Sequence, residues 1–182
     1  MNVAPAVARM SIGVVVERRK AASAWIDYIW QPVAVLPGHP EAEPWTVLAA
    51  DGDATTFYAG AADLALHRTE TGQYRDNLAS GAPALWVMLR PTGIEPPYRV
   101  VAVTADPAEG ESFTQAGDDL VGVVPMPAVV RDMLEAFIAE HHVERPFFKR
   151  ERDRDEPWEQ ARPASVEKRP AGEKPIEKDK GR

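Results

Sequence analysis

The feature that most constrains folding is an abrupt change in composition immediately after Phe147 and Phe148. Residues 149–182 contain 11 Lys or Arg and 9 Asp or Glu, but only three large apolar side chains. A segment with so little to bury cannot offset the entropy that is lost on ordering. We therefore expect one folded domain at residues 11–148, a disordered charged tail at residues 149–182 and a frayed N-terminus at residues 1–10.

Charge and composition exclude several classes of protein. The net charge is −7, and the 148 residues before the tail carry 10 basic and 19 acidic groups. Such an acidic domain repels phosphate backbones, so we expect no nucleic-acid binding. The absence of cysteine excludes disulfides, thiolate metal sites and thiol catalysis. No apolar run reaches the ~18 residues of a membrane span, and the first ten residues, broken by Pro5, do not resemble a secretory signal. We expect a cytoplasmic protein without membrane insertion.

Apolar, β-branched runs alternate with turn signals through most of the chain, which is typical of strands. The predicted strands are residues 12–16, 25–36, 45–48, 55–59, 62–67, 83–90, 98–104 and 121–124. Gln31-Pro32 interrupts the second run and predicts a bulge or an edge position there. The last two long runs, 83–90 and 98–104, are predicted to form an antiparallel hairpin.

Two helices are predicted, at residues 69–80 before Gly81 and at residues 128–142. The second has an apolar stripe at three- to four-residue spacing, formed by Val130, Met133, Leu134, Phe137, Ile138 and His141. The acidic residues 105–119 are predicted to be a loop. Strands with short connections followed by a terminal helix indicate an α+β domain, with a mainly antiparallel sheet covered by the C-terminal amphipathic helix.

No catalytic or cofactor-binding motif is present. The sequence has neither a nucleophile elbow nor a phosphate-cradling loop. His141 and His142 are adjacent on a helix and therefore point in different directions, so we interpret them as favourable charges at a helix C-terminus and not as metal ligands. Asp118-Asp119 is interpreted as a solvated loop. We expect no catalytic residue, no metal and no cofactor.

Partner contact is the better-motivated function. Trp25 and Trp30 are separated by five positions, so on a regular strand they face opposite sides, and one of them is a candidate exposed anchor. Beyond the last helix, two aromatics stand beside a basic cluster formed by Phe147, Phe148, Lys149, Arg150 and Arg152. This segment resembles a docking peptide with aromatic anchors and steering charges. Alternatively, the two phenylalanines simply close the core.

Five stretches together resemble a known family: VVVERR at 14–19, WQPVAVLPG at 30–38, LWVMLR at 85–90, VPMP at 124–127 and FFKR at 147–150. They are similar to domain-of-unknown-function family 3305 of proteobacteria, over roughly residues 11–154. The resemblance implies an association with molybdenum-dependent formate dehydrogenase, and it implies no catalytic or binding residues.

Two functional hypotheses, together with a homo-oligomeric structural role, remain open. The first is a non-catalytic accessory or assembly protein that contacts a formate dehydrogenase subunit or maturation factor. The alternative is a pterin- or nucleotide-binding protein, or an enzyme of molybdenum cofactor handling, that uses a tryptophan as its stacking platform.

Overall fold

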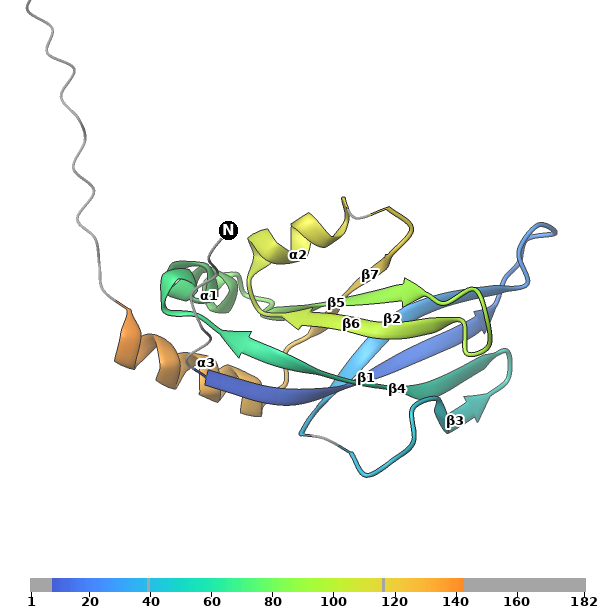
Figure 1. Cartoon of the computed structure of the whole chain (residues 1–182), viewed down its shortest axis with the longest axis horizontal. Coiled ribbons are helices and arrows are strands. Elements are labelled where there is room, and N and C mark those ends of the chain that lie inside the picture. Colours follow the sequence, from blue (N-terminus) through green and yellow to red (C-terminus); the bar gives the residue numbers. More distant parts are fainter. Residues whose placement is uncertain (1–7, 39, 116, 143–182) are drawn as a thin grey trace, which may run out of the picture. The chain divides into compact units, whose positions relative to one another are not determined.

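The computed structural model describes residues 8–38, 40–115 and 117–142, and Figure 1 shows how their elements are arranged. In chain order the elements are β1 (Ala8–Lys20), β2 (Tyr28–Pro37), β3 (Thr46–Asp51), β4 (Ala54–Leu66), a 3-10 turn (Arg68–Glu70), α1 (Thr71–Ala79), β5 (Ala84–Pro91), β6 (Tyr98–Thr104), α2 (Pro107–Phe113), β7 (Leu120–Pro125) and α3 (Ala128–His141). The predicted mixed α+β class is confirmed.

The strands form two antiparallel sheets. One sheet has the order β2-β1-β4-β3 and the other has the order β6-β5-β7. The sheets meet along two lines, where β4 runs beside β6 and β2 runs beside β7. On the second line a Cβ at Gly122 would lie 2.6 Å from Cδ of Pro32, so only glycine permits this approach. The predicted hairpin of β5 and β6 is confirmed.

The hydrophobic core lies between the two sheets and extends to the helices. Alternating residues of β1 contribute Ile12, Val14 and Val16, and β5 contributes Leu85, Val87 and Leu89 in the same way. All of these side chains are fully buried. The apolar runs predicted at residues 12–16 and 83–90 therefore form strands that contribute to the core.

Two irregularities bend the first sheet near the middle of β1. Its register against β4 shifts after Val14, and its register against β2 shifts after Val15. The first shift leaves Ala59 of β4 without a register partner, next to Gly60 at a φ of +122°. Residues 55–59 and 62–67 are therefore one long, bent strand, and the prediction of two separate strands is wrong. The second shift lies next to Pro32, which confirms the predicted bulge.

The helices lie towards one end of the strands, and the hairpin of β1 and β2 projects at the other end (Figure 1). Helix α3 buries Val130, Leu134 and Phe137, as its stripe predicted. Its main partner is α1, where the rings of Tyr74 and Phe137 lie 6.2 Å apart. The predicted covering of a sheet by this helix is not confirmed.

Element boundaries also differ from the predictions elsewhere. Strand β2 begins at Tyr28, so Trp25, which was predicted to begin the strand at 25–36, lies in the loop before it. Strand β1 begins at Ala8 and so includes three residues that we assigned to the frayed N-terminus. The predicted loop at 105–119 contains helix α2, which Asp106 caps by accepting from the N–H groups of Ala108 and Glu109. No helix in the described part of the chain is long and apolar enough to cross a membrane.

Candidate functional site

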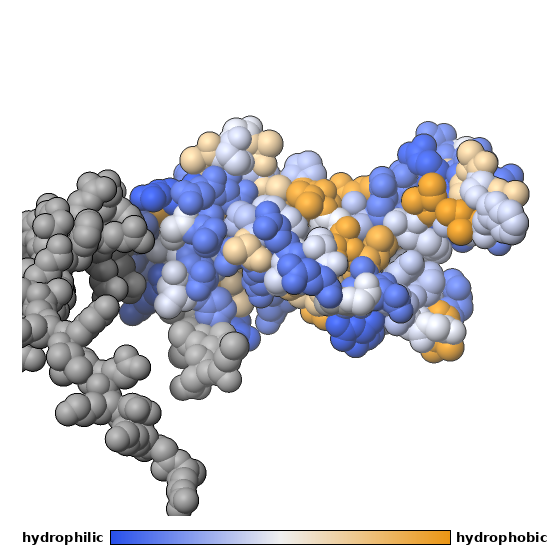
Figure 2. Space-filling model, turned by 90° about the horizontal axis from the view of Figure 1, so that it is seen from above, coloured by the Kyte–Doolittle hydropathy of each residue, from blue (hydrophilic) through white to orange (hydrophobic). Residues whose placement is uncertain are grey.

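Four exposed large apolar side chains, including the most exposed one among the described residues, lie on the projecting hairpin of β1 and β2, residues 18–30, which we call the arm. The exposed fractions are 94% for Trp25, 52% for Ile26 and 47% for each of Tyr28 and Ile29. Figure 2 shows apolar and weakly polar side chains among charged ones at the right-hand end of the molecule, where the arm projects. Exposed large apolar groups gathered in one place are typical of contact surfaces.

An aromatic cluster of Trp30, Trp45, Phe57 and Tyr98 lies at the base of the arm. The indole of Trp30 is central, with centroid distances of 5.8 Å to Trp45, 5.8 Å to Phe57 and 6.1 Å to Tyr98. Trp45 and Phe57 are 5.9 Å apart. These rings come from β2, β4, β6 and the turn before β3, so the cluster fastens the arm to both sheets.

Arg18 lies over this cluster. Its guanidinium carbon is 4.7 Å from the ring centroid of Tyr28, 5.7 Å from that of Trp30 and 5.4 Å from that of Phe57. Strand register explains the contacts with Trp30 and Phe57. Arg18 of β1 pairs with Trp30 of β2, and Val16, two residues earlier in β1, pairs with Phe57 of β4. A cation over aromatic faces is attracted by the ring quadrupoles.

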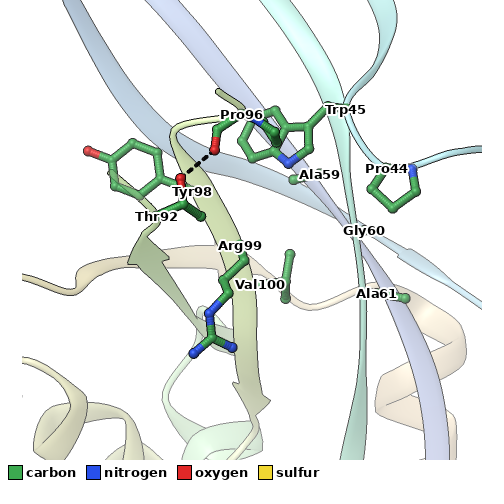
Figure 3. Close-up of a pocket in the computed structure, with 10 residues that line it drawn as sticks. All are labelled: Pro44, Trp45, Ala59, Gly60, Ala61, Thr92, Pro96, Tyr98, Arg99 and Val100. Carbon is green, nitrogen blue, oxygen red and sulfur yellow. Dashed lines mark hydrogen bonds between the residues drawn. The ribbon is translucent and has the colours of Figure 1, made fainter. Parts of the chain in front are cut away.

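A shallow pocket of about 330 Å³ adjoins the cluster where β4 passes β6 (Figure 3). Trp45 and Tyr98 contribute to its lining, and the hydroxyl of Thr92 donates to the carbonyl of Pro96 at its rim. Trp45 has a φ of 70°, a left-handed conformation that a bulky side chain adopts only at a cost. Figure 3 shows Arg99 extending away from Trp45.

A second pocket of about 480 Å³ lies between α1 and β5, next to Trp86 and the buried Asn77. The Asn77 amide donates to the carbonyls of Ala84 and Ala105 and accepts from the N–H of Ala84. Nearby, burial raises the pKa of Asp106 above its usual range, although its capping bonds act in the opposite direction. Each of these polar groups has a structural partner.

Ordinary packing also accounts for the other titratable candidates. Both carboxylate oxygens of Asp119 accept from Arg90, at 2.9 and 2.7 Å, and this pairing lowers the pKa of Asp119. Nε2 of His142 lies 3.1 Å from the guanidinium of Arg75, and its Nδ1 lies 3.1 Å from the hydroxyl oxygen of Thr71.

The predicted contact residues fall into two groups. Trp25 lies in the loop between β1 and β2, residues 21–27, which we call the tip of the arm. Trp30 is half-buried in the aromatic cluster. Phe147, Phe148, Lys149, Arg150 and Arg152 lie outside the described residues. Within the described residues, no group of three or more His, Asp or Glu side chains is arranged to hold a metal ion. Arg18 was not among the predicted contact residues. Its only signal in the sequence was that it lies two and four positions after Val16 and Val14, and therefore on the same strand face as these buried residues.

The fold and this site define a two-sheet antiparallel domain with a projecting aromatic hairpin. Residues 11–152 match the family model described as a protein of unknown function, DUF3305, so the chain belongs to this family, as its motifs predicted. No curated protein and no solved structure matches the chain. The association with formate dehydrogenase stays a prediction.

Proposed function

We propose that this protein is a non-catalytic, cytoplasmic accessory or assembly protein of a molybdenum-dependent formate dehydrogenase system, and that it acts by protein–protein contact. The observation that supports contact as its mode of action is the exposed apolar tip of the arm, with Trp25 94% exposed. The formate dehydrogenase part of the proposal rests on the family resemblance alone.

The composition of the tip supports a protein partner. Tryptophan and tyrosine combine a large apolar area with a polar edge, and they are enriched among the residues that dominate binding energies at interfaces. Full burial of a large apolar side chain stabilises by roughly 1.5–3 kcal/mol, and Trp25, which is 94% exposed, has almost all of its area left to bury. A partner that covers the tip recovers this free energy.

The segment that contains Phe147, Phe148, Lys149, Arg150 and Arg152 is proposed as a second contact. Its aromatic side chains would anchor it, and its cations would steer it towards an acidic partner. The arm and this segment make separable contributions, so each is testable by its own variant.

The test is an affinity purification from the native host, read by mass spectrometry, with four forms of the tagged chain. These are the wild type, Trp25→Ser combined with Ile26→Ser, the matched control Val129→Ser, and a chain ending at Val143. Val129 is 56% exposed, close to the 52% of Ile26, but it lies on α3. We expect wild type and Val129→Ser to recover formate dehydrogenase subunits or maturation factors, and the arm variant to lose them.

Loss with the chain ending at Val143, provided that it keeps its circular dichroism spectrum, would assign part of the contact to the segment beyond it. Equal recovery of these proteins by the arm variant would contradict a role for the arm. Recovery by none of the four forms would contradict the proposed association.

The second candidate function is binding of a pterin or a nucleotide. The observation in its favour is the pocket of about 330 Å³ beside Trp45 and Tyr98, because planar ligands stack on such rings. This function predicts saturable quenching of tryptophan fluorescence by pterins or nucleotides, and loss of that quenching in Trp45→Leu. Flat titrations across both ligand classes would exclude it.

A further inference from the structure

Arg18 differs from the other cations of the arm in its surroundings. Its guanidinium lies within 5.7 Å of the ring centroids of Tyr28, Trp30 and Phe57. Three rings hold the planar group in one place and restrict the rotamers that a free arginine explores in water. A cation held in this way loses less entropy when it binds an anion, because part of that cost is met in the unbound protein.

The donors of Arg18 are not used within the described structure. Among residues 8–38, 40–115 and 117–142, no side chain or carbonyl accepts a hydrogen bond from its guanidinium, and no carboxylate forms an ion pair with it. Its neighbour Arg19 behaves differently, because Nε and Nη2 of Arg19 donate to the Glu17 carboxylate at 3.1 and 2.9 Å. Arg18 therefore presents a rigid fork of N–H groups without an acceptor from the described chain.

The charge around Arg18 contrasts with that of the domain as a whole. The 148 residues before the tail carry 10 basic and 19 acidic groups, yet three of those basic groups are the consecutive Arg18, Arg19 and Lys20. Strand alternation places Lys20 on the same face of β1 as Arg18, and register pairs it with Tyr28. Arg18 and Lys20 thus place two cations on one face of the arm, with Arg19 on the opposite face of β1. Two cations on an acidic domain fit a small acidic group better than a long phosphate backbone.

We infer that Arg18 is the anchor for an Asp or Glu carboxylate in an acidic–apolar segment of a partner protein. The fork matches the two oxygens of a carboxylate, with Lys20 adding charge from the same face. Apolar side chains of that segment would lie on Tyr28 and on Trp25 and Ile26 in the adjoining loop. This inference rests on the proposed function for contact through the arm, but it does not depend on formate dehydrogenase being the partner.

The experiment selects phage-displayed random peptides on the immobilised full-length wild-type protein. Selected peptides are then synthesised and titrated by fluorescence anisotropy against wild type, Arg18→Met and the matched control Arg19→Met. We expect selected peptides to carry Asp or Glu next to an aromatic or aliphatic residue. Arg18→Met should weaken their binding about ten-fold or more, the usual range for a lost charge-assisted hydrogen-bonded pair, whereas Arg19→Met should bind like wild type.

Three outcomes would overturn the inference: no selection of acidic–apolar peptides, equal affinity of Arg18→Met and wild type, or preferential Arg18-dependent binding of a single-stranded oligonucleotide or of inorganic phosphate in the same assay.

If circular dichroism shows that Arg18→Met does not fold, the salt dependence of peptide binding by the wild type tests the inference instead. Affinity should fall between about 50 mM and about 500 mM salt, because exposed charge pairs are screened over this range. Unchanged affinity contradicts the inference. If the peptide experiment contradicts the inference about Arg18 but the affinity purification recovers formate dehydrogenase, the inference is wrong and the proposed function is still supported.

Discussion

The helical end of the molecule and the arm differ in whether their polar groups have hydrogen-bond partners and whether their apolar side chains are buried. At the helical end, Asn77 makes three hydrogen bonds, and the Tyr74 hydroxyl accepts from the N–H of His67. At the arm, the Arg18 guanidinium has ring faces but no acceptor among the described residues, and Trp25 is 94% exposed. The named polar groups of the first region are satisfied by other described residues, whereas the second region leaves N–H donors and apolar area exposed. Under the proposed function, stability and partner contact are therefore concentrated in different parts of one domain.

The largest expected effect concerns Asn77, which joins α1 to β5 and to the residue after β6. Replacing it with leucine leaves the N–H and C=O of Ala84 and the C=O of Ala105 without this partner. Unsatisfied buried groups cost about 1–3 kcal/mol each, so Asn77→Leu should lower the free energy of unfolding by about 3 kcal/mol or more. Urea denaturation checks this, with Gln73→Leu on the exposed face of α1 as control. Equal free energies of unfolding for the two variants would contradict the claim that the hydrogen bonds of Asn77 stabilise the helical end.

The two helical glycines should respond in opposite directions to alanine. A Cβ at Gly110 in α2 would overlap the indole of Trp86, whereas a Cβ at Gly72 in α1 meets nothing within 4 Å. Gly110→Ala should therefore destabilise by about 1–3 kcal/mol or more. Gly72→Ala should stabilise by up to about 1 kcal/mol, because alanine loses less entropy in a helix. Thermal unfolding of both variants is the measurement, and a shift of the same sign in both would refute this packing.

The two tryptophans of the arm sharpen the comparison within a single hairpin. Trp30 packs against three aromatic rings, so Trp30→Ala should cost about 2 kcal/mol or more of stability. Trp25→Ala should change stability by less than about 0.5 kcal/mol, since the side chain is almost fully exposed. Guanidinium unfolding curves measure both. A large loss of stability in Trp25→Ala would mean that the side chain stabilises the fold, which would contradict its assignment to partner contact.

A smaller, pH-dependent effect is expected at Tyr74. Burial raises the pKa of its hydroxyl from 10.0 to about 12. Because the folded-state pKa is the higher one, this contribution to stability is complete below pH 10 and is lost as the pH rises towards 12. Tyr74→Phe should cost about 1 kcal/mol near neutral pH through its lost hydrogen bond, and it should lack this alkaline loss. Urea midpoints between neutral pH and pH 11 test the expectation, and parallel curves for both proteins would disprove it.

Residue type and periodicity correctly predicted the elements that have a clear local signal. The strand at 98–104 was predictable from its β-branched valines, and the stripe of α3 was predictable from the three- to four-residue spacing that burial of one helix face requires. Helix α2 was missed because its acidic, glycine-containing sequence has no apolar stripe. Its signal was the Asp106-Pro107 start with Glu109 in the first turn, a typical helix N-terminus.

The candidate site was less predictable because it depends on register. Trp30, Trp45, Phe57 and Tyr98 are far apart in the sequence, and two register shifts around Val14 and Val15 decide which of them share a face. A shift of one residue moves every side chain to the opposite face. The position of Arg18 over three rings therefore follows from strand pairing, which a single sequence does not specify.

The most direct test of the central claim, that the arm is a contact surface, is photo-crosslinking in living host cells. The photoreactive amino acid p-benzoylphenylalanine replaces Trp25 in one strain and the similarly placed but distant Val129 of α3 in another. After irradiation, crosslinked products are identified by mass spectrometry. The account predicts a crosslink from position 25 to a formate dehydrogenase subunit or maturation factor, and none to these proteins from position 129. Crosslinks from position 129 alone, or from neither position, would contradict it.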